Sequence, residues 1–182
     1  MPVLIPDLLY DGGAFRRGLG LEIDAASGRI ARVEDARELE RAARVRGDVV
    51  EMLPGRALVP GFVNAHSHAF QRLIRGRTQW RPAAEPEADF WSWREAMYAA
   101  ALTLSPDDVY HASRFCFLEM LRAGFTSVGE FHYLHRDPAG EAYTDPNELA
   151  LRVIAAAEDV GIRIALLNTC YAAGGIGRPL EP

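Results

Sequence analysis

Two histidines separated by one residue, His66 and His68, are the side chains of this sequence best suited to chemistry. They follow an apolar run at residues 58–63, as expected for the end of a β-strand. Side chains at positions i and i+2 of a strand point to the same face, so the two imidazoles would converge on one point. Neutral imidazole is a good zinc ligand, and zinc normally takes three or four protein ligands. The pair therefore predicts half of a divalent metal site.

The composition is that of an ordinary globular protein of one or two domains. The chain has 182 residues, of which 49% are hydrophobic and 25% charged. Its net charge of -5 argues against nucleic acid or an anionic membrane as the main partner. No apolar run approaches the roughly 20 residues of a membrane span, and no signal-peptide pattern is present, so a cytoplasmic location is expected. Cys116 and Cys170 show neither metal-site spacing nor a disulfide pattern.

The first sixty residues predict a small β-rich domain. Apolar or alternating runs at residues 3–9, 19–23 and 29–33 are separated by turn signals at 11–13 and 26–28. Residues 38–46 are charged and fit either a helical turn or a solvated connection. Pro54-Gly55 is interpreted as a turn between strands at 49–53 and 57–63, the second of which leads into the histidine pair.

The remaining residues predict alternating strands and helices. Ser105-Pro106-Asp107-Asp108 is a helix start, which residues 145–148 repeat, and Gly124 and Gly161 end the two helices. Strands at 125–131 and 162–168 follow these helices. The order βαβαβ predicts a parallel sheet with right-handed crossovers, and the almost wholly apolar third strand indicates cover on both faces.

An insertion of different character lies between the histidines and the Ser105 helix. Residues 75–87 are polar and contain proline, which predicts a loop, and the aromatic stretch from Phe90 leads into a short helix ending near Leu102. Loops after the carboxyl ends of strands carry the chemistry of α/β barrels. This insertion follows the histidine pair directly.

The predicted fold class is α/β, as the N-terminal portion of a metal-dependent (β/α)₈ barrel. Its proposed domains are residues 1–60, a small β-rich domain, and residues 61–182, the first three β/α units of an incomplete barrel. A complete barrel needs about 250 residues, so we expect a truncated part of a larger protein. The alternative is an open three-stranded sheet, whose free edges could pair to form a homodimer.

Residues 57–68, Ala-Leu-Val-Pro-Gly-Phe-Val-Asn-Ala-His-Ser-His, resemble the first barrel strand of the amidohydrolase superfamily. Three stretches together resemble the formimidoylglutamate deiminases of histidine degradation: His66–Arg72, Phe90–Tyr98 and Gly129–Tyr133. The resemblance runs in order over about residues 1–175. It implies one divalent metal, usually zinc, held by His66 and His68 with a histidine and an aspartate from later strands.

The same resemblance implies a site for a small substrate that carries two carboxylates. Gln71, Arg94 and Tyr133 match family residues that contact substrate, and arginine is independently the best bidentate partner for a carboxylate. The implied reaction is hydrolysis of a non-peptide C–N bond, from N-formimidoyl-L-glutamate to N-formyl-L-glutamate and ammonia, with water activated by the metal. No catalytic proton-transfer residue is expected within the chain; these groups are expected beyond Pro182, so the 182 residues alone are expected to be inactive.

Structural and functional alternatives remain open from the residues alone. The histidines could be ordinary strand residues, Arg94 could stack on Trp91 or Trp93, Gln71 could be a polar residue at a helix start, and Tyr133 could pack in the core. Glu130 and His132 share a strand face and are expected to hydrogen bond behind the metal ligands. The alternative functions are an amidohydrolase deaminase of a heterocyclic amine, or a non-catalytic fragment.

Overall fold

The computed structural model describes residues 1–78, 90–174 and 177, and these form two compact units, Met1–Pro60 and Gly61–Pro182. Most of the predicted loop at 75–87 and the end of the chain from residue 175 lie outside the described residues, apart from residue 177. Within the described residues, no helix combines the length and the apolar character needed to cross a membrane.

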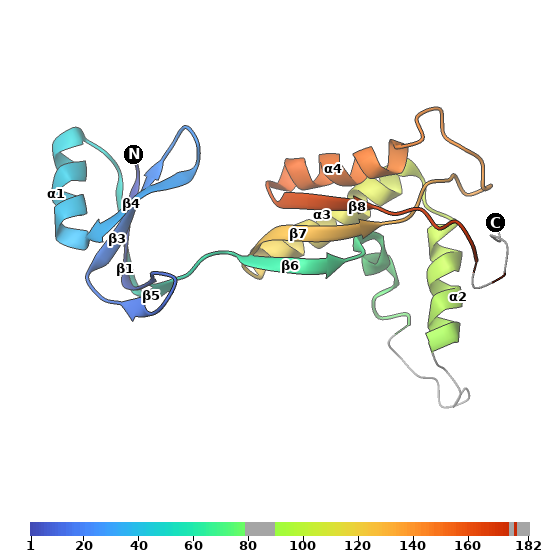
Figure 1. Ribbon diagram of the computed structural model, residues 1–182, viewed down its shortest axis with the longest axis horizontal. Coiled ribbons are helices and arrows are strands. Elements are labelled where there is room, and N and C mark those ends of the chain that lie inside the picture. Colours follow the sequence, from blue (N-terminus) through green and yellow to red (C-terminus); the bar gives the residue numbers. More distant parts are fainter. Residues whose placement is uncertain (79–89, 175–176, 178–182) are drawn as a thin grey trace. The chain divides into compact units, whose positions relative to one another are not determined.

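The N-terminal unit (residues 1–60) is a five-stranded sheet with one helix (Figure 1). Its elements are β1 (Val3–Tyr10), β2 (Phe15–Arg16), β3 (Leu19–Asp24), β4 (Arg29–Asp35), α1 (Ala36–Arg46) and β5 (Val50–Leu58). The strand order is β2-β1-β3-β4, and β5 pairs in parallel with β1. Leu39 and Ala43 of α1 are fully buried against Val3 and Ile5 of β1, which forms a small apolar core.

The structure decides two questions in this unit that the sequence left open or answered wrongly. The charged residues 38–46 belong to helix α1, because Asp35 accepts hydrogen bonds from the Arg37 and Glu38 amides at its start. Pro54-Gly55 does not separate two strands: β5 continues through it with a register shift against β1. The Gly55 amide donates to the Asp7 carboxylate at 2.8 Å, so contact with a neighbouring strand replaces the predicted turn. The predicted strand at 57–63 is divided between β5 and β6.

A fully buried carboxylate, that of Glu22 on β3, is the main polar feature of the N-terminal unit. It accepts a hydrogen bond from Arg32 at 2.5 Å and lies 3.1 Å from Arg46. Burial alone would raise the pKa of Glu22, but the two guanidinium groups together lower it below its ordinary value. Glu22 is therefore charged and paired inside this unit.

The C-terminal unit (residues 61–182) contains a parallel sheet, as predicted, and its strand order is β6-β7-β8. Its elements are β6 (Phe62–Ser67), the 3₁₀ helix η1 (Ala69–Ile74), α2 (Phe90–Ala101), α3 (Pro106–Arg122), β7 (Phe125–His132), α4 (Glu148–Val160) and β8 (Arg163–Asn168). The carboxyl ends of β6, β7 and β8 lie at one edge of the sheet, where η1 begins (Figure 1).

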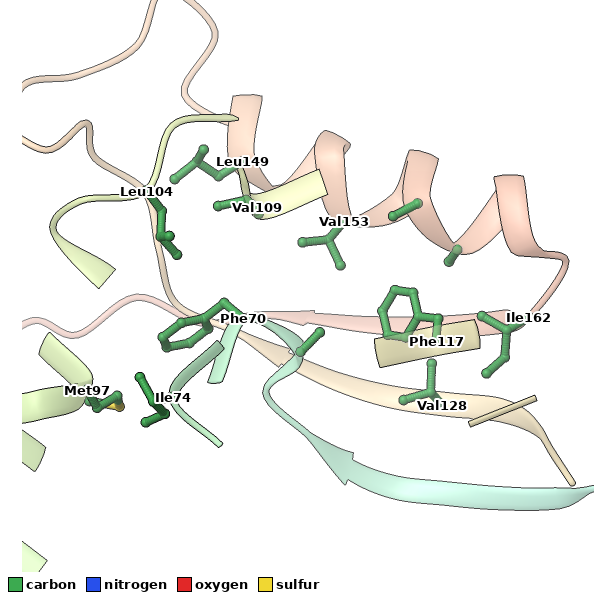
Figure 2. Close-up of a cluster of buried hydrophobic side chains, with 13 residues drawn as sticks. Phe70, Ile74, Met97, Leu104, Val109, Phe117, Val128, Leu149, Val153 and Ile162 are labelled. Carbon is green, nitrogen blue, oxygen red and sulfur yellow. The ribbon is translucent and has the colours of Figure 1, made fainter. Parts of the chain in front are cut away.

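The apolar core of this unit lies between the sheet and the helices. Phe117 of α3 is fully buried and lies near Val128 of β7, with Val153 of α4 on the helical side of the cluster (Figure 2). The next residue along the helix, Leu118, is 42% exposed, so it is Phe117 that turns toward the core. The large core residues of α3 and α4 thus pack both helices against the same face of the sheet.

The opposite face of the sheet is open among the described residues. On β8, Ile164 and Leu166 pack into the core, whereas Leu167 is 51% exposed and Ala165 is also exposed. The prediction that this strand is covered on both faces is wrong here, because α3 and α4 cover only one. The described residues of this unit therefore form an open parallel sheet with helices on one face, and not a closed barrel.

The two long helices of this unit begin in different ways. Ser105 and Asp108 form a capping box at the start of α3, as their spacing predicts. Helix α4 begins at Glu148, at the end of the predicted start motif, and its N-cap Asn147 makes no side-chain capping bond. Asp145 instead accepts the Asn147 amide at 2.8 Å, so its carboxylate stabilises the preceding turn.

Candidate metal centre

His66 and His68 lie side by side at the carboxyl end of β6. Their ring centroids are 4.8 Å apart and the rings are nearly perpendicular. The pairing of β6 with β7 shifts register between Asn64 and Ser67, which is a bulge directly at the histidines. His66 is exposed and His68 is partly buried, while Ser67 between them is buried.

A backbone carbonyl fixes the tautomer of His68. Its Nδ1 lies 3.0 Å from the Phe131 carbonyl oxygen, which can only accept a hydrogen bond, so Nδ1 carries the proton. The lone pair is then on Nε2, the arrangement found in metal-bound histidines whose other nitrogen is hydrogen-bonded. Burial lowers the pKa of His68 despite this bond, and His66 lowers it further. His68 is thereby kept neutral, which is the form that binds metals.

These two imidazoles fit one half of a zinc ligand set. Nitrogen donors suit zinc, and the free Nε2 of His68 is available because the carbonyl occupies Nδ1. No group of three or more His, Cys, Asp or Glu side chains in the described part of the chain could hold a metal ion. Any further ligands would have to come from outside that part.

Glu130 on β7 supports the turn that follows the histidines. It is 2% exposed, and its Oε1 accepts the Ala69 backbone amide at 2.6 Å. Burial raises the pKa of Glu130, while hydrogen bonds from Ser67 and Ala69 oppose this rise. At Gly129 an added Cβ would lie 3.1 Å from the Ala65 carbonyl oxygen, so glycine allows the close approach of β6 at its bulge.

His132 shares the buried face of β7 with Glu130, but it faces a different neighbour. It is 4% exposed, and burial together with the nearby His135 lowers its pKa to about 4. The rings of His132 and His135 are 5.4 Å apart, and His135 Nε2 lies 2.8 Å from the Thr169 carbonyl oxygen. His132 Nε2 has no hydrogen-bond partner among the described residues. Glu130 therefore bonds Ser67 and Ala69, the residues on either side of His68, and its hydrogen bonds do not reach the imidazoles themselves.

Gln71 and Tyr133 meet beside His68. The Gln71 amide donates to the Tyr133 hydroxyl at 2.9 Å, and the Tyr133 ring lies 5.3 Å from the His68 ring, edge to face. The Met97 sulfur accepts from both groups, at 3.2 Å in each case. Burial raises the pKa of Tyr133 to about 12 despite the Gln71 bond, so its hydroxyl stays protonated.

Arg94 is the one predicted substrate residue that does not join this cluster. Its guanidinium lies over the Trp91 and Tyr98 rings, at 5.6 and 4.9 Å from their centroids, and donates to the Tyr98 hydroxyl at 3.0 Å. These contacts are all within α2. In this structure Arg94 therefore stacks on Trp91, which is one of the alternatives stated for it above. Arg94 and Met97 lie about one turn apart on the same helix.

Two contributors to the site were missed from the sequence. The Phe131 carbonyl is a backbone group, so no residue type signals it. Met97 falls at helical spacing within an apolar stretch, where methionine usually indicates core packing. The contacts of its sulfur with Gln71 and Tyr133 join residues far apart in the sequence, so they arise only in the folded chain.

The histidine pair and the parallel sheet both lie in the part of the chain that matches a known protein family. Residues 57–179 match the sequence profile of the Amidohydrolase family, and the chain belongs to this family. It is 39% identical over 170 residues to formimidoylglutamate deiminase of Pseudomonas aeruginosa. The aligned region covers 93% of this chain and 34% of the relative.

Solved structures show the same fold. An amidohydrolase from Brucella melitensis superposes with a TM-score of 0.83 at 32% identity, over 100% of this chain and 38% of that chain. An adenosine deaminase from Xanthomonas campestris with bound zinc gives 0.63 at 21% identity, over 90% of this chain and 32% of that one. This chain thus spans about a third of the length of these proteins.

Proposed function

We propose that this chain forms the N-terminal part of a formimidoylglutamate deiminase, which hydrolyses N-formimidoyl-L-glutamate to N-formyl-L-glutamate and ammonia. The observation that carries the proposal is the contact between His68 and Tyr133, with Gln71 hydrogen-bonded to the same hydroxyl. This contact brings two proposed substrate donors next to a proposed metal ligand. The 39% identity to the Pseudomonas aeruginosa enzyme over 93% of the chain supports the same substrate.

In this proposal, His66 and His68 hold one divalent metal, taken to be zinc as in the adenosine deaminase of the same fold. A bound metal supplies a Lewis acid that lowers the pKa of water. The Phe131 carbonyl keeps His68 in the tautomer whose Nε2 faces away from the backbone bond. Glu130 holds the Ala69 amide, and so fixes the turn that follows the two ligands.

The substrate carboxylates would be bound by the donors of η1, β7 and α2. Tyr133 is protonated and Gln71 presents an amide, so both can donate to carboxylate oxygens. Arg94 would leave its stacked position to form a bidentate pair with a carboxylate, which is stronger than a neutral hydrogen bond. Groups that transfer protons to the leaving ammonia are expected outside the 182 residues.

Metal binding is the first test. His68→Ala is expected to lower zinc affinity of the chain at least about tenfold, because one of two imidazole ligands is lost. Isothermal titration with zinc and the absorption spectrum of bound cobalt would measure this. His111→Ala is the matched control, since His111 is an exposed residue of α3. Equal losses for the two variants would count against the site.

Activity is the second test. In a protein that carries this chain with the rest of the barrel, ammonia release is expected with N-formimidoyl-L-glutamate and not with adenosine, guanine or cytosine. Arg94→Ala is expected to raise KM for the dicarboxylate. Activity on a heterocyclic amine that Arg94→Ala leaves unchanged would favour the alternative deaminase function. The 182 residues alone are expected to release no more ammonia than their His66→Ala variant.

A further inference from the structure

The sulfur of Met97 is the point at which three separate elements of the candidate site meet. Met97 is on α2 and is 5% exposed. Its sulfur lies 3.2 Å from Gln71 Nε2 on η1 and 3.2 Å from the Tyr133 hydroxyl, which follows β7. Gln71 and Tyr133 are also bonded to each other at 2.9 Å, which closes a triangle of polar contacts.

The chemistry of sulfur decides which groups donate in this triangle. A thioether has no proton and can only accept, so the atom of Gln71 that faces it must be the amide nitrogen. By the same reasoning the Tyr133 hydroxyl gives its proton to Met97, and therefore accepts from Gln71. A leucine of similar volume would fill the space but could accept neither hydrogen bond.

Met97 also connects these donors to Arg94. Helix α2 has Met97 as its one buried residue, and Trp93, Ala100 and Ala101 pack against the edge of the same core, so Met97 is the most deeply held point of the helix beside η1 and the end of β7. Arg94 lies one turn earlier on α2, and its own contacts are with Trp91 and Tyr98 of the same helix. The position of the Arg94 guanidinium relative to Gln71 and Tyr133 thus depends on where Met97 is held.

We propose that Met97 is a positioning residue, whose thioether orients Gln71 and Tyr133 as donors and keeps α2, with Arg94, in register with them. A thioether is a weak acceptor, whereas bonds to a carboxylate are roughly twice as strong as neutral ones. A carboxylate of the ligand can therefore replace sulfur as the acceptor for both groups. This last step rests on the function proposed above; the hydrogen bonds to sulfur do not.

The test uses the side-chain amide signals of the ¹⁵N-labelled 182-residue chain without metal or substrate. The chain has two glutamines, Gln71 and Gln79, so the Gln71 signals can be assigned with a single Gln71→Glu variant. Met97→Leu is expected to shift the Gln71 amide signals and to speed their exchange with water about three- to tenfold, the effect of one lost hydrogen bond. Tyr133→Phe should act on the same signals, and the double variant should show less than the summed effects.

Met120→Leu is the matched control. The Met120 sulfur lies 3.7 Å from Asn64 Nδ2, so this variant should change Asn64 signals and leave those of Gln71 unaltered. Gln71 signals at the positions of a freely exposed amide, or unmoved by Met97→Leu, would overturn the role of Met97. Addition of glutarate, a simple dicarboxylate, is expected to move the same signals in the wild type. If Met97→Leu acts as expected and glutarate does not, the positioning role stands and the dicarboxylate function is refuted.

Discussion

The N-terminal and C-terminal units each contain a sheet with helices packed against it, but their buried polar groups lie in different places. In the N-terminal unit the charged Glu22 is fully buried within the fold and paired with Arg32 and Arg46. In the C-terminal unit the core between sheet and helices is apolar, and the candidate site gathers at the carboxyl ends of its strands. The buried charge of the first unit is therefore paired inside its fold, whereas the polar groups of the candidate site lie at the strand ends of the second unit.

Strand β7 shows how the C-terminal unit keeps stability and chemistry apart. Val128 packs into the core and Glu130 holds the Ala69 amide from the same buried face. Phe131 stands between Glu130 and His132 in the sequence. Its ring centroid lies 5.4 Å from that of His68, and its carbonyl oxygen accepts the hydrogen bond of His68 Nδ1. Alternation along a single strand thus lets neighbouring residues serve the core and the site.

The largest expected effect breaks the apolar core of the C-terminal unit. Phe117→Ala should lower the free energy of unfolding of this unit by about 3–5 kcal/mol, because a large buried ring is removed and a cavity remains. Phe115→Ala on the same helix is the control; that ring is 51% exposed and lies near Arg72, so about 1 kcal/mol or less is expected. Amide hydrogen exchange, resolved by residue, would measure both. Similar losses in the two variants would contradict the proposed core.

The next effect tests the buried ion pairs of the N-terminal unit. Glu22→Gln should destabilise this unit by about 1–3 kcal/mol at neutral pH, because hydrogen bonds to charged partners are weakened. The pKa of Glu22 is below its ordinary value of 4.5, so its contribution is complete above that pH and is lost as pH falls through the lowered pKa.

Acidification should therefore destabilise the wild-type N-terminal unit more steeply than the Glu22→Gln variant. Hydrogen exchange of amides in β3 and α1, followed from neutral pH to below 4.5, gives this slope. Glu51→Gln is a suitable control, since Glu51 is exposed on β5. Parallel slopes in all three proteins would show that the Glu22 pairs contribute no acid sensitivity.

The smallest effect compares the two helix starts within the C-terminal unit. Ser105→Ala should cost about 1 kcal/mol, since it removes the side-chain oxygen that accepts the Asp108 amide. Asn147→Ala should cost less, because Asn147 makes no capping bond. Exchange rates of the first-turn amides of α3 and α4 would report the two costs separately. A larger loss at Asn147 would show that capping in solution differs from the structure.

Local sequence signals were reliable where the interactions are local. Ser105 and Asp108 are three residues apart and specify the start of α3 by themselves, and Gly161 ends α4 with a φ of 78°, in the left-handed region that suits glycine. The parallel arrangement of β6, β7 and β8 was also predicted from the alternation of strands and helices. Each of these features depends on neighbouring residues or on a general rule of topology.

Features that depend on distant contacts were not predictable. Pro54-Gly55 resembles a turn, yet Asp7 on another strand binds the Gly55 amide and keeps β5 continuous. Asp145 is the exception among the local signals, because it resembles a helix cap but accepts the amide of Asn147 two residues away, and Asn147 is the N-cap of α4. In the candidate site the histidines and Gln71 are recognisable by type, whereas the Met97 sulfur acquires its role only when α2, η1 and β7 are brought together.

The bond from His68 to the Phe131 carbonyl has a consequence for sequence variation. Every amino acid carries the same carbonyl, so substitution at position 131 leaves the acceptor of His68 in place as long as β7 keeps its path. Evolution can therefore change the side chain at this position, and with it the surroundings of the His68 ring, without losing the protonation pattern of that ring. The most constrained property of residue 131 is its backbone position, which the pairing of β7 with β8 maintains through Leu167.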